Sequence, residues 1–355
     1  MNTRKRKIII ISCVILIVIL LIVPLTLSIM IYEGNFSDRY ETYGPYIRRI
    51  AEFEGLNSQK YTFTSNQGQR LVGYKYFKNI ENTKGIVVIS HGLGGGGHNS
   101  FMNVANFFAS NGYDVFAYDA TGNDESEGSS VEGIPQFLID LDYAIQFVKQ
   151  TPDFNGSPIV LFGHSLGGYS VGSVLNLHPD VKAIVMVAGF NGSMDIIEEE
   201  GRNIAGDGID VLLPYISLYE RIKFGEYALY NSISGFKNTD SGVMIIHSKD
   251  DEMISQEKSF DVFYDIYKDN ARFNFVEYED RGHDFVYYSD KSHEYRDEFN
   301  RKFDEYLNSL DEEFTAEWKL SYLNENLDKK LLYDLDEELM DSIVKFYDQY
   351  VKWAL

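Results

Sequence analysis

Short apolar runs alternate with amphipathic stretches over most of the chain. Residues 85–90 and 183–188 are apolar at nearly every position, which is typical of parallel strands that are covered on both faces. Between such runs, apolar residues recur at helical spacing. This alternation predicts a doubly wound, mostly parallel sheet of the α/β class. The expected buried strands are residues 85–90, 114–118, 158–162, 183–188, 242–247 and 273–278.

A different pattern leads into this core. Alternating residues 61–64 and 71–77 lie on either side of a turn at 65–68, and they predict an antiparallel hairpin. Residues 33–58 before the hairpin form a polar, aromatic-rich connector. Its aromatic and aliphatic residues fall near helical spacing, so we expect one short packed helix after Gly44 and Pro45.

The alternation breaks between about residues 190 and 240. This segment of mixed helical character interrupts two sheet strands, so we interpret it as a cap over the carboxyl ends of the strands. Ligands bind at that end of α/β sheets. The expected catalytic domain therefore spans residues 59–310 and includes the cap.

The end of the chain is helical and acidic. We expect one helix from about 289 to 310 and then an extension over residues 311–355. A stripe of large apolar residues in this extension must be buried against something. We expect it to pack on the sheet or the cap, with a partner-facing or lipid-facing helix as the alternative. The stripe consists of Leu339, Ile343, Phe346, Tyr350 and Trp353.

The first 32 residues have the pattern of a membrane-spanning segment. A basic tail over residues 1–7 precedes an apolar run over 8–31, which is longer than the roughly 20 residues that span a bilayer. A cleaved signal sequence usually has a shorter apolar core and a small-residue cleavage site. We therefore expect a transmembrane anchor at residues 8–32, with the tail in the cytoplasm and the rest outside it. This predicts a single-pass protein of the cell membrane.

Composition excludes several functions. The 355 residues carry a formal net charge of −22, which argues against nucleic-acid binding. Cys13 is the single cysteine, so neither an intramolecular disulfide nor a cysteine-based zinc site is expected. The seven histidines follow no metal-binding pattern, and we expect no metal and no cofactor. The sequence gives no signal for an oligomeric state.

The strongest chemical signal is a serine between two glycines. Residues 163–168 read Gly-His-Ser-Leu-Gly-Gly and lie between an expected strand and an expected helix. In that setting a Gly-x-Ser-x-Gly sequence forms a nucleophile elbow, a strained turn that exposes the serine hydroxyl. Side chains at positions 163 and 167 would collide across this turn. Ser165 is therefore the expected nucleophile.

A nucleophilic serine needs a histidine base and an acid on later loops of the same sheet. Of the four histidines after Ser165, His283 alone follows the last expected strand in a glycine-preceded loop. Asp250 and Asp251 both follow the preceding strand. The spacing Asp-x-x-Ile to Ile254 favours Asp251, with Asp250 as the alternative. The acid would hold the tautomer of His283.

A glycine-rich loop over residues 91–98 follows the first buried strand. It lacks the lysine and hydroxyl residue of a phosphate-binding loop. Next to the elbow, its backbone N–H groups suit half of an oxyanion hole, as in esterases with a His-Gly-Gly-Gly loop. We expect the two donors to be the backbone N–H groups of Leu93 and Leu166. His91 and His164 would serve in packing and hydrogen bonding beside the elbow.

These motifs together resemble the α/β-hydrolase superfamily over about residues 60–308. Within it they resemble the branch of monoacylglycerol lipases, lysophospholipases and serine aminopeptidases. Thr121 stands where the family has an arginine, and the loop after His91 has extra glycines. The residues that carry the resemblance are His91-Gly92-Leu93-Gly94, Asp119, Gly122, Ser126, Gly128, the elbow, Asp251 and Gly282-His283.

The sequence therefore predicts a membrane-anchored serine hydrolase that cleaves carboxylic esters through an acyl-enzyme, with a small-molecule acyl ester as substrate. Lipid-type esters are favoured because the anchor keeps the domain near lipid. A peptidase or amidase is the alternative enzyme, since carboxylates in the cap at 198–200 could bind a free amine. A non-catalytic binding protein on the same fold is a third reading, and it predicts a broken triad.

Overall fold

The computed structural model describes residues 3–81, 83–94, 96–154, 156–309 and 315–351. Its centre is one eight-stranded sheet in the order β1-β2-β4-β3-β5-β6-β7-β8. The two strands of the expected hairpin are antiparallel, and β3 to β8 are parallel to one another. The predicted fold class is therefore confirmed. The strands are β1 (Asn57–Thr64), β2 (Arg70–Phe77), β3 (Ile86–Ser90), β4 (Asp114–Asp119), β5 (Ile159–His164), β6 (Ala183–Val187), β7 (Gly242–Ser248) and β8 (Phe273–Tyr278).

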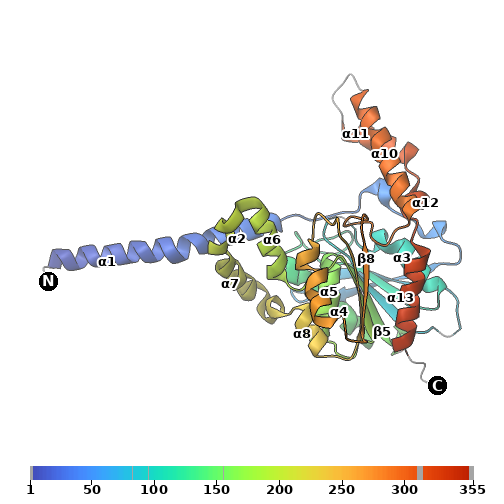
Figure 1. Cartoon of the computed structure of the whole chain (residues 1–355), viewed down its shortest axis with the longest axis horizontal. Coiled ribbons are helices and arrows are strands. Elements are labelled where there is room, and N and C mark those ends of the chain that lie inside the picture. Colours follow the sequence, from blue (N-terminus) through green and yellow to red (C-terminus); the bar gives the residue numbers. More distant parts are fainter. Residues whose placement is uncertain (1–2, 82, 95, 155, 310–314, 352–355) are drawn as a thin grey trace.

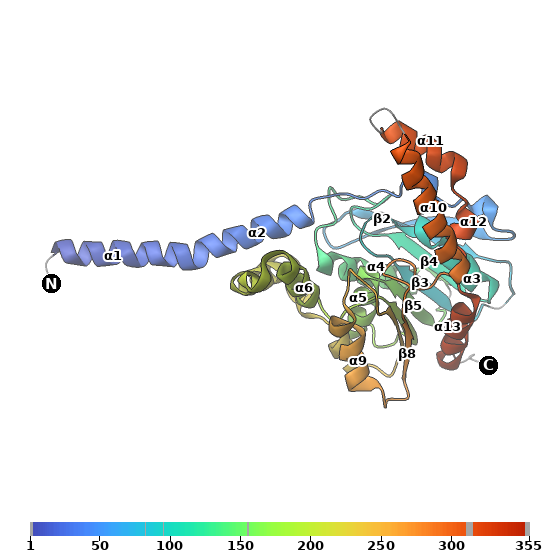
Figure 2. The ribbon, with the colours of Figure 1, turned by 45° about the horizontal axis from the view of Figure 1, so that its top comes forward.

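Helices cover both faces of the sheet, so its central strands are buried throughout (Figures 1 and 2). On one face, α3 and α13 pack against β3 and β5, and the Tyr347 hydroxyl donates to the Leu161 carbonyl over 2.7 Å. The other face carries α4, α5, α8 and α9. The bounds are α3 (Met102–Ser110), α4 (Ile134–Gln150), α5 (Leu166–Ser173), α8 (Ser232–Lys237), α9 (Phe260–Tyr267) and α13 (Glu337–Tyr350).

The C-terminal region divides into a projecting arm and a packed helix. Helices α10 (Asp290–Asn308) and α11 (Ala316–Asn326) form the arm, which stands out from the sheet (Figure 1). Helix α13 instead buries Leu339, Ile343 and Phe346 on the sheet. The apolar stripe thus packs on the sheet. Trp353 and the expected boundary at 310/311 lie outside the described residues.

The connector does not contain the expected packed helix. It forms two 3₁₀ turns, η2 (Gly44–Tyr46) and η3 (Ile50–Glu52). Each is too short to propagate as a helix, and distant partners hold the segment instead. The buried Arg48 side chain donates to Asn103 Oδ1 and to the Lys329 carbonyl, both over 3.0 Å. Remaining short elements are η4 (His98–Phe101), η5 (Pro152–Phe154), η6 (Val174–Asn176), η9 (Gln256–Lys258) and α12 (Lys329–Leu332).

The N-terminus is one continuous helix that runs from Thr3 to Asn35. It consists of α1 (Thr3–Ile17), the π-helical turn η1 (Val18–Ile22) and α2 (Val23–Asn35). It is long and apolar enough to cross a membrane, and its most apolar window is not buried by the rest of the chain. A signal sequence has the same properties. Its first half points away from the sheet domain (Figure 1).

The segment between β6 and β7 is helical and lies beside α2. It consists of α6 (Ser193–Ala205), η7 (Gly206–Val211), α7 (Leu213–Phe224), η8 (Gly225–Leu229) and α8. We call the part from α6 to η8 the cap. Helix α7 packs along α2, and the two share an apolar cluster that includes Tyr32, Ile216 and Phe224. Figure 1 shows α6 and α7 as the part of the domain nearest to α1.

Candidate active site

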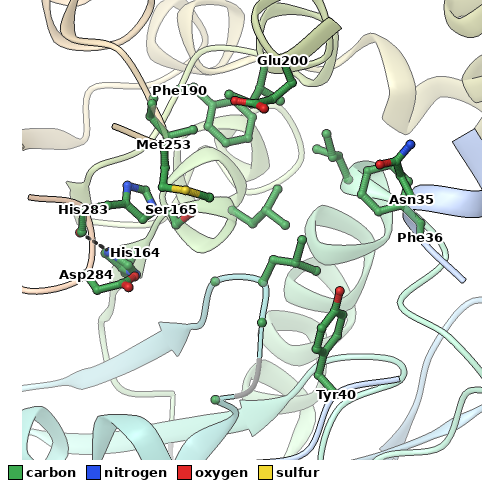
Figure 3. Close-up of a pocket in the computed structure, with 18 of the residues that line it drawn as sticks. Asn35, Phe36, Tyr40, His164, Ser165, Phe190, Glu200, Met253, His283 and Asp284 are labelled. Carbon is green, nitrogen blue, oxygen red and sulfur yellow. Dashed lines mark hydrogen bonds between the residues drawn. The ribbon is translucent and has the colours of Figure 1, made fainter. Parts of the chain in front are cut away.

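Ser165 lies in a strained turn between β5 and α5. Its backbone has φ 56° and ψ −120°, which a serine adopts only when the surroundings force it. Its N–H donates to the Val187 carbonyl over 2.9 Å, and its carbonyl accepts from the Tyr169 N–H in the first turn of α5. The strand and the helix therefore fix both sides of the turn, and the hydroxyl faces a cavity (Figure 3).

Two glycines make this turn possible. A Cβ at Gly163 would overlap the Gly167 carbonyl, as the sequence suggested. A Cβ at Gly167 would overlap the Ser90 carbonyl at the end of β3. The second clash is with a neighbouring strand and could not be foreseen from the pentapeptide. Both positions exclude side chains because backbone segments meet there.

The structure brings the three residues of the expected triad together. His283, in the loop after β8, has Nε2 2.9 Å from Ser165 Oγ and Nδ1 2.8 Å from Asp251 Oδ2. A carboxylate accepts, so Nδ1 carries the proton and Nε2 accepts from the serine hydroxyl. This arrangement suits proton transfer from the serine to the histidine.

The structure distinguishes the two candidate acids. The Oδ1 atom of Asp251 accepts the N–H groups of Met253 and Ile254, each over 2.9 Å, and Oδ2 faces His283. Burial alone would raise the pKa of Asp251, but the His283 hydrogen bond and charge outweigh it and lower that pKa. Asp250 instead accepts from Ser248 Oγ and the Gly282 N–H, and it braces the histidine loop.

The expected oxyanion donors line the cavity beside the serine. Leu166 begins α5, and Leu93 lies in the loop after β3. A Cβ at Gly92 would come within 3.1 Å of Ser165 Cβ, so this loop passes directly over the nucleophile. Among the hydrogen bonds of the described residues, neither the Leu93 nor the Leu166 N–H is a donor. Gly95 of the same loop lies outside the described residues.

Two buried histidines support these loops. His91 accepts the Ala120 N–H at Nε2 over 2.9 Å and donates from Nδ1 to the Gly92 carbonyl over 2.7 Å. His164 donates from Nε2 to the His283 carbonyl over 2.9 Å. Burial and the neighbouring His283 lower the pKa of His164 to about 4, so it is neutral at physiological pH. Each histidine therefore ties one loop of the site in place.

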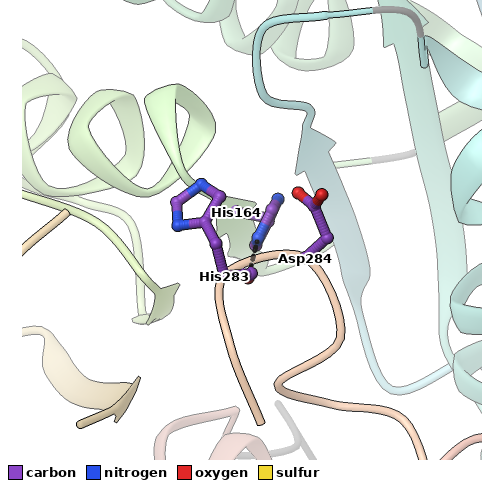
Figure 4. A group of neighbouring side chains, drawn as sticks. All are labelled: His164, His283 and Asp284. Atoms are coloured by element: carbon purple, nitrogen blue, oxygen red, sulfur yellow. Dashed lines mark hydrogen bonds between the residues drawn. The ribbon is translucent and has the colours of Figure 1, made fainter. Parts of the chain in front are cut away.

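His164, His283 and Asp284 also form a cluster whose ligand-type atoms lie within 4.8 Å of one another (Figure 4). A metal ion here would need nitrogen atoms that are already engaged. Both nitrogens of His283 face Ser165 and Asp251, and His164 Nε2 bonds to a carbonyl. The arrangement suits a hydrogen-bonded histidine better than a metal centre.

The serine and histidine open onto a cavity of about 720 Å³, a size typical of small-molecule sites. Its far wall comes from the N-terminal helix. Figure 3 shows Asn35 and Phe36 across the cavity from Ser165 and His283. From the sequence, Asn35 and Phe36 were expected to belong to the connector, and no role in a binding site was predicted for them. The sequence hint was that the apolar helix ends in polar residues. Which of its residues face the cavity depends on how the helix packs against the cap.

The cap supplies an apolar lining with one notable carboxylate. Ile196, Ile197, Ile209 and Ile216 of the cap line the cavity. Glu200 lines it too, and burial and the nearby Glu199 raise the pKa of Glu200.

The other two cap carboxylates considered for amine binding are engaged elsewhere. Glu198 pairs with Arg202 over 3.0 Å, and Glu199 accepts the Ser255 N–H. A pair of free carboxylates, which a peptidase could use to hold an amine, is therefore not assembled at residues 198–200.

An arginine of the connector reaches the loop where the sequence lacks the family's arginine. Arg39 donates to the carbonyls of Ser126 and Gly128 over 2.8 and 3.1 Å, and also to the Asp124 carbonyl. It thus orders the loop after β4 from outside it. Thr121, in the family's arginine position, instead donates to Asp140.

Residues 81–222 match a family model described as serine aminopeptidase, S33. The match includes the glycine-rich loop and Ser165 and ends before Asp251 and His283. Two curated relatives from Escherichia coli, of strain K12 and of O157:H7, are 22% identical over 195 residues. Both are named uncharacterized protein YfhR. The match covers 54% of this chain and 63% of the length of each relative.

Solved structures are similar in fold. The esterase Pf2001 of Pyrococcus furiosus aligns with a TM-score of 0.53 at 15% identity and covers 77% of this chain and 97% of its own. The acylaminoacyl peptidase of Pyrococcus horikoshii aligns with a TM-score of 0.50 at 18% identity and covers 76% of this chain and 44% of its own. Likeness at such identities concerns the fold and transfers no substrate.

Proposed function

We propose that this chain is a serine hydrolase of the α/β-hydrolase superfamily, and that it cleaves carboxylic esters of the acyl-lipid type while anchored in the cell membrane. The observation that carries the proposal is the hydrogen-bonded series from Ser165 through His283 to Asp251. A non-catalytic binding protein would have no need for this series or for the strained backbone of the serine.

The geometry supports a two-step acyl transfer. His283 takes the proton of Ser165 as its Oγ attacks the ester carbonyl, and Asp251 stabilises the resulting imidazolium. The N–H groups of Leu93 and Leu166 hold the oxyanion, and His283 then gives the proton to the leaving alcohol. Water activated by His283 releases the acid and restores the serine.

The cavity favours an ester with an apolar acyl group. Its cap wall is formed largely by isoleucines, which offer apolar contact and no hydrogen bonds for a peptide backbone. The alternative, a peptidase, is supported by the match to the serine aminopeptidase family model and by Glu200. Glu200 lines the cavity and could bind the amine of a substrate.

The N-terminal helix supports membrane attachment. Its apolar run over residues 8–31 exceeds the roughly 20 residues that a bilayer needs, and four basic residues precede it. We infer that residues 1–7 remain in the cytoplasm and that the catalytic domain lies outside it.

Labelling with a fluorophosphonate probe tests the chemistry. We expect the full-length protein in detergent to be labelled and the Ser165→Ala variant not to be. Absence of Ser165-dependent labelling would refute the proposed enzymatic activity. If labelling occurs, p-nitrophenyl esters of increasing chain length should be cleaved faster than aminoacyl anilides. The opposite preference would favour the peptidase.

A further inference from the structure

The last turns of the N-terminal helix belong both to the membrane segment and to the cavity. Ile31, Tyr32 and Phe36 line the cavity. The Tyr32 hydroxyl donates to Glu220 Oε1 of α7 over 2.8 Å, and Lys223 of α7 pairs with Glu33 over 2.7 Å. The helix is therefore fixed to the cap by specific polar contacts as well as by apolar packing.

These contacts also set the depth of the cap. The apolar run over residues 8–31 rises by about 36 Å, and the hydrocarbon core of a bilayer is about 30 Å thick. The hydroxyl of Tyr215, in the cap, donates to the Leu20 carbonyl. Leu20 is only about 18 Å along the helix from Ile8. The cap therefore meets the helix within the length that a bilayer would occupy.

The bond to Leu20 has a local cause in the sequence. Pro24 has no N–H, so it cannot donate to the carbonyl four residues before it, which is that of Leu20. A carbonyl without a donor is costly in hydrocarbon. The Tyr215 hydroxyl supplies a donor there, and the Ser28 hydroxyl bonds to the Leu212 carbonyl over 3.4 Å.

The cap exposes apolar side chains close to these contacts. Val211, next to Leu212, is 62% exposed, and Ile204 at the end of α6 is 83% exposed. Such side chains are stabilised at the boundary between headgroups and acyl chains. Nearby Arg202 pairs with Asp207 and Asp210 over 3.2 and 2.7 Å. The guanidinium beside the exposed apolar residues is therefore paired.

Ile31 and Ile204 line the cavity and are 39% and 83% exposed, so the cavity has a mouth beside them. We propose that this mouth, between α2 and α6, opens into the outer leaflet and admits the acyl chain of a membrane-resident ester lipid to Ser165. The proposal rests on the function proposed above. The helix is then a wall of the substrate site as well as an anchor.

Fluorescence quenching tests how deeply the cap lies in the bilayer, and the measurement does not depend on catalysis. In a Cys13→Ser background, Val211→Cys and Ile266→Cys carry an environment-sensitive fluorophore, and the full chain is reconstituted in phosphatidylcholine vesicles. Ile266, on α9, is similarly exposed at 53% and serves as the matched control. We expect spin-labelled phosphatidylcholine to quench position 211 at least twofold more than position 266. Equal quenching of both positions by aqueous iodide would overturn the proposal.

Activity of the Val211→Asp variant tests the entry route. We expect a loss of at least fivefold on a long-chain ester dissolved in the vesicles and less than twofold on a water-soluble short-chain ester. Ile266→Asp should change neither rate. Equal effects of Val211→Asp on both substrates would overturn the proposed entry route from the outer leaflet. Failure of Ser165 to react with the fluorophosphonate would instead refute the proposed function, and the quenching result would remain interpretable.

Discussion

The cavity has two walls that are built in different ways. The catalytic wall consists of loops at the ends of neighbouring strands, and hydrogen bonds join Ser165, His283 and Asp251 in sequence. The opposite wall consists of α2 and the cap, and it is largely apolar. Its carboxylate is Glu200. Buried Glu220 does not line the cavity; it lies between α2 and the cap, and its Oε2 has no hydrogen-bond partner in the described part of the chain.

This difference separates chemistry from selection. In the proposed reaction the catalytic wall fixes where bonds are made and broken, so a change there should affect every substrate. The apolar wall determines what reaches the serine, so a change there should affect some substrates more than others. Experiments on the two walls should therefore differ in size and in substrate dependence.

The largest contrast should come from neighbouring aspartates of the catalytic wall. Asp251→Asn should lower kcat by about 10³–10⁴-fold on all esters, because His283 loses the partner that fixes its tautomer. Asp250→Asn keeps an oxygen acceptor for the Gly282 N–H and should stay within about tenfold. Steady-state kinetics of both variants measure this, and the reverse order would assign the acid to Asp250.

A smaller loss is expected where the glycine-rich loop crosses the serine. An Ala side chain at position 92 would lie 3.1 Å from Ser165 Cβ and 3.3 Å from the His164 carbonyl. Gly92→Ala should therefore displace the oxyanion donors and lower kcat by about tenfold or more. Gly44→Ala, in open space, is the control. Unchanged kcat in Gly92→Ala would place the oxyanion donors elsewhere.

The apolar wall should respond selectively. Phe36→Ala removes aromatic surface that faces Ser165 across the cavity. We expect kcat/KM to fall by about five- to tenfold for long-chain esters and by less for acetate esters, since only long chains reach that wall. A chain-length series measures this. A uniform loss across the series would show that Phe36 acts on the catalytic wall.

The smallest effect should be a pH-dependent change in stability. Burial raises the pKa of Glu220, while hydrogen bonds from Ser193 and Tyr32 oppose the shift. Its folded-state pKa therefore exceeds the unfolded value. The stability it contributes is complete below the unfolded pKa and is lost as pH rises through the folded pKa.

Glu220→Gln removes this dependence. The variant should match the parent near pH 4 and exceed it by about 1 kcal/mol near pH 8, because a neutral amide avoids the cost of a buried charge. Thermal unfolding at both pH values in detergent measures this. A variant that is less stable than the parent at pH 8 would show that the ionised carboxylate stabilises the contact between helix and cap.

The sheet, and the three residues that meet as the expected triad, could be predicted from the sequence because both depend on local signals. The strand at 159–164, the glycines beside Ser165 and the loop position of His283 can each be read within a few residues. The choice of Asp251 needed only the spacing to Ile254, whose N–H indeed bonds to that carboxylate.

The remaining features depend on residues far apart in the sequence. The wall at Phe36 exists because α2 packs on α7, which lies some 180 positions later. The connector is tied down by the hydrogen bond from Arg48 to the Lys329 carbonyl, and no local pattern predicts that bond. The apolar stripe predicted that α13 packs on the sheet or the cap, but the sequence could not choose between them or show that α10 projects from the sheet.

The hydrogen bond from Tyr32 to Glu220 joins the N-terminal helix to α7 of the cap. In the membrane-anchored protein proposed above, a protease that cut the chain after this helix would separate the domain from the anchor and from one side of its cavity. Detachment from the membrane would then be coupled to a change in substrate selectivity.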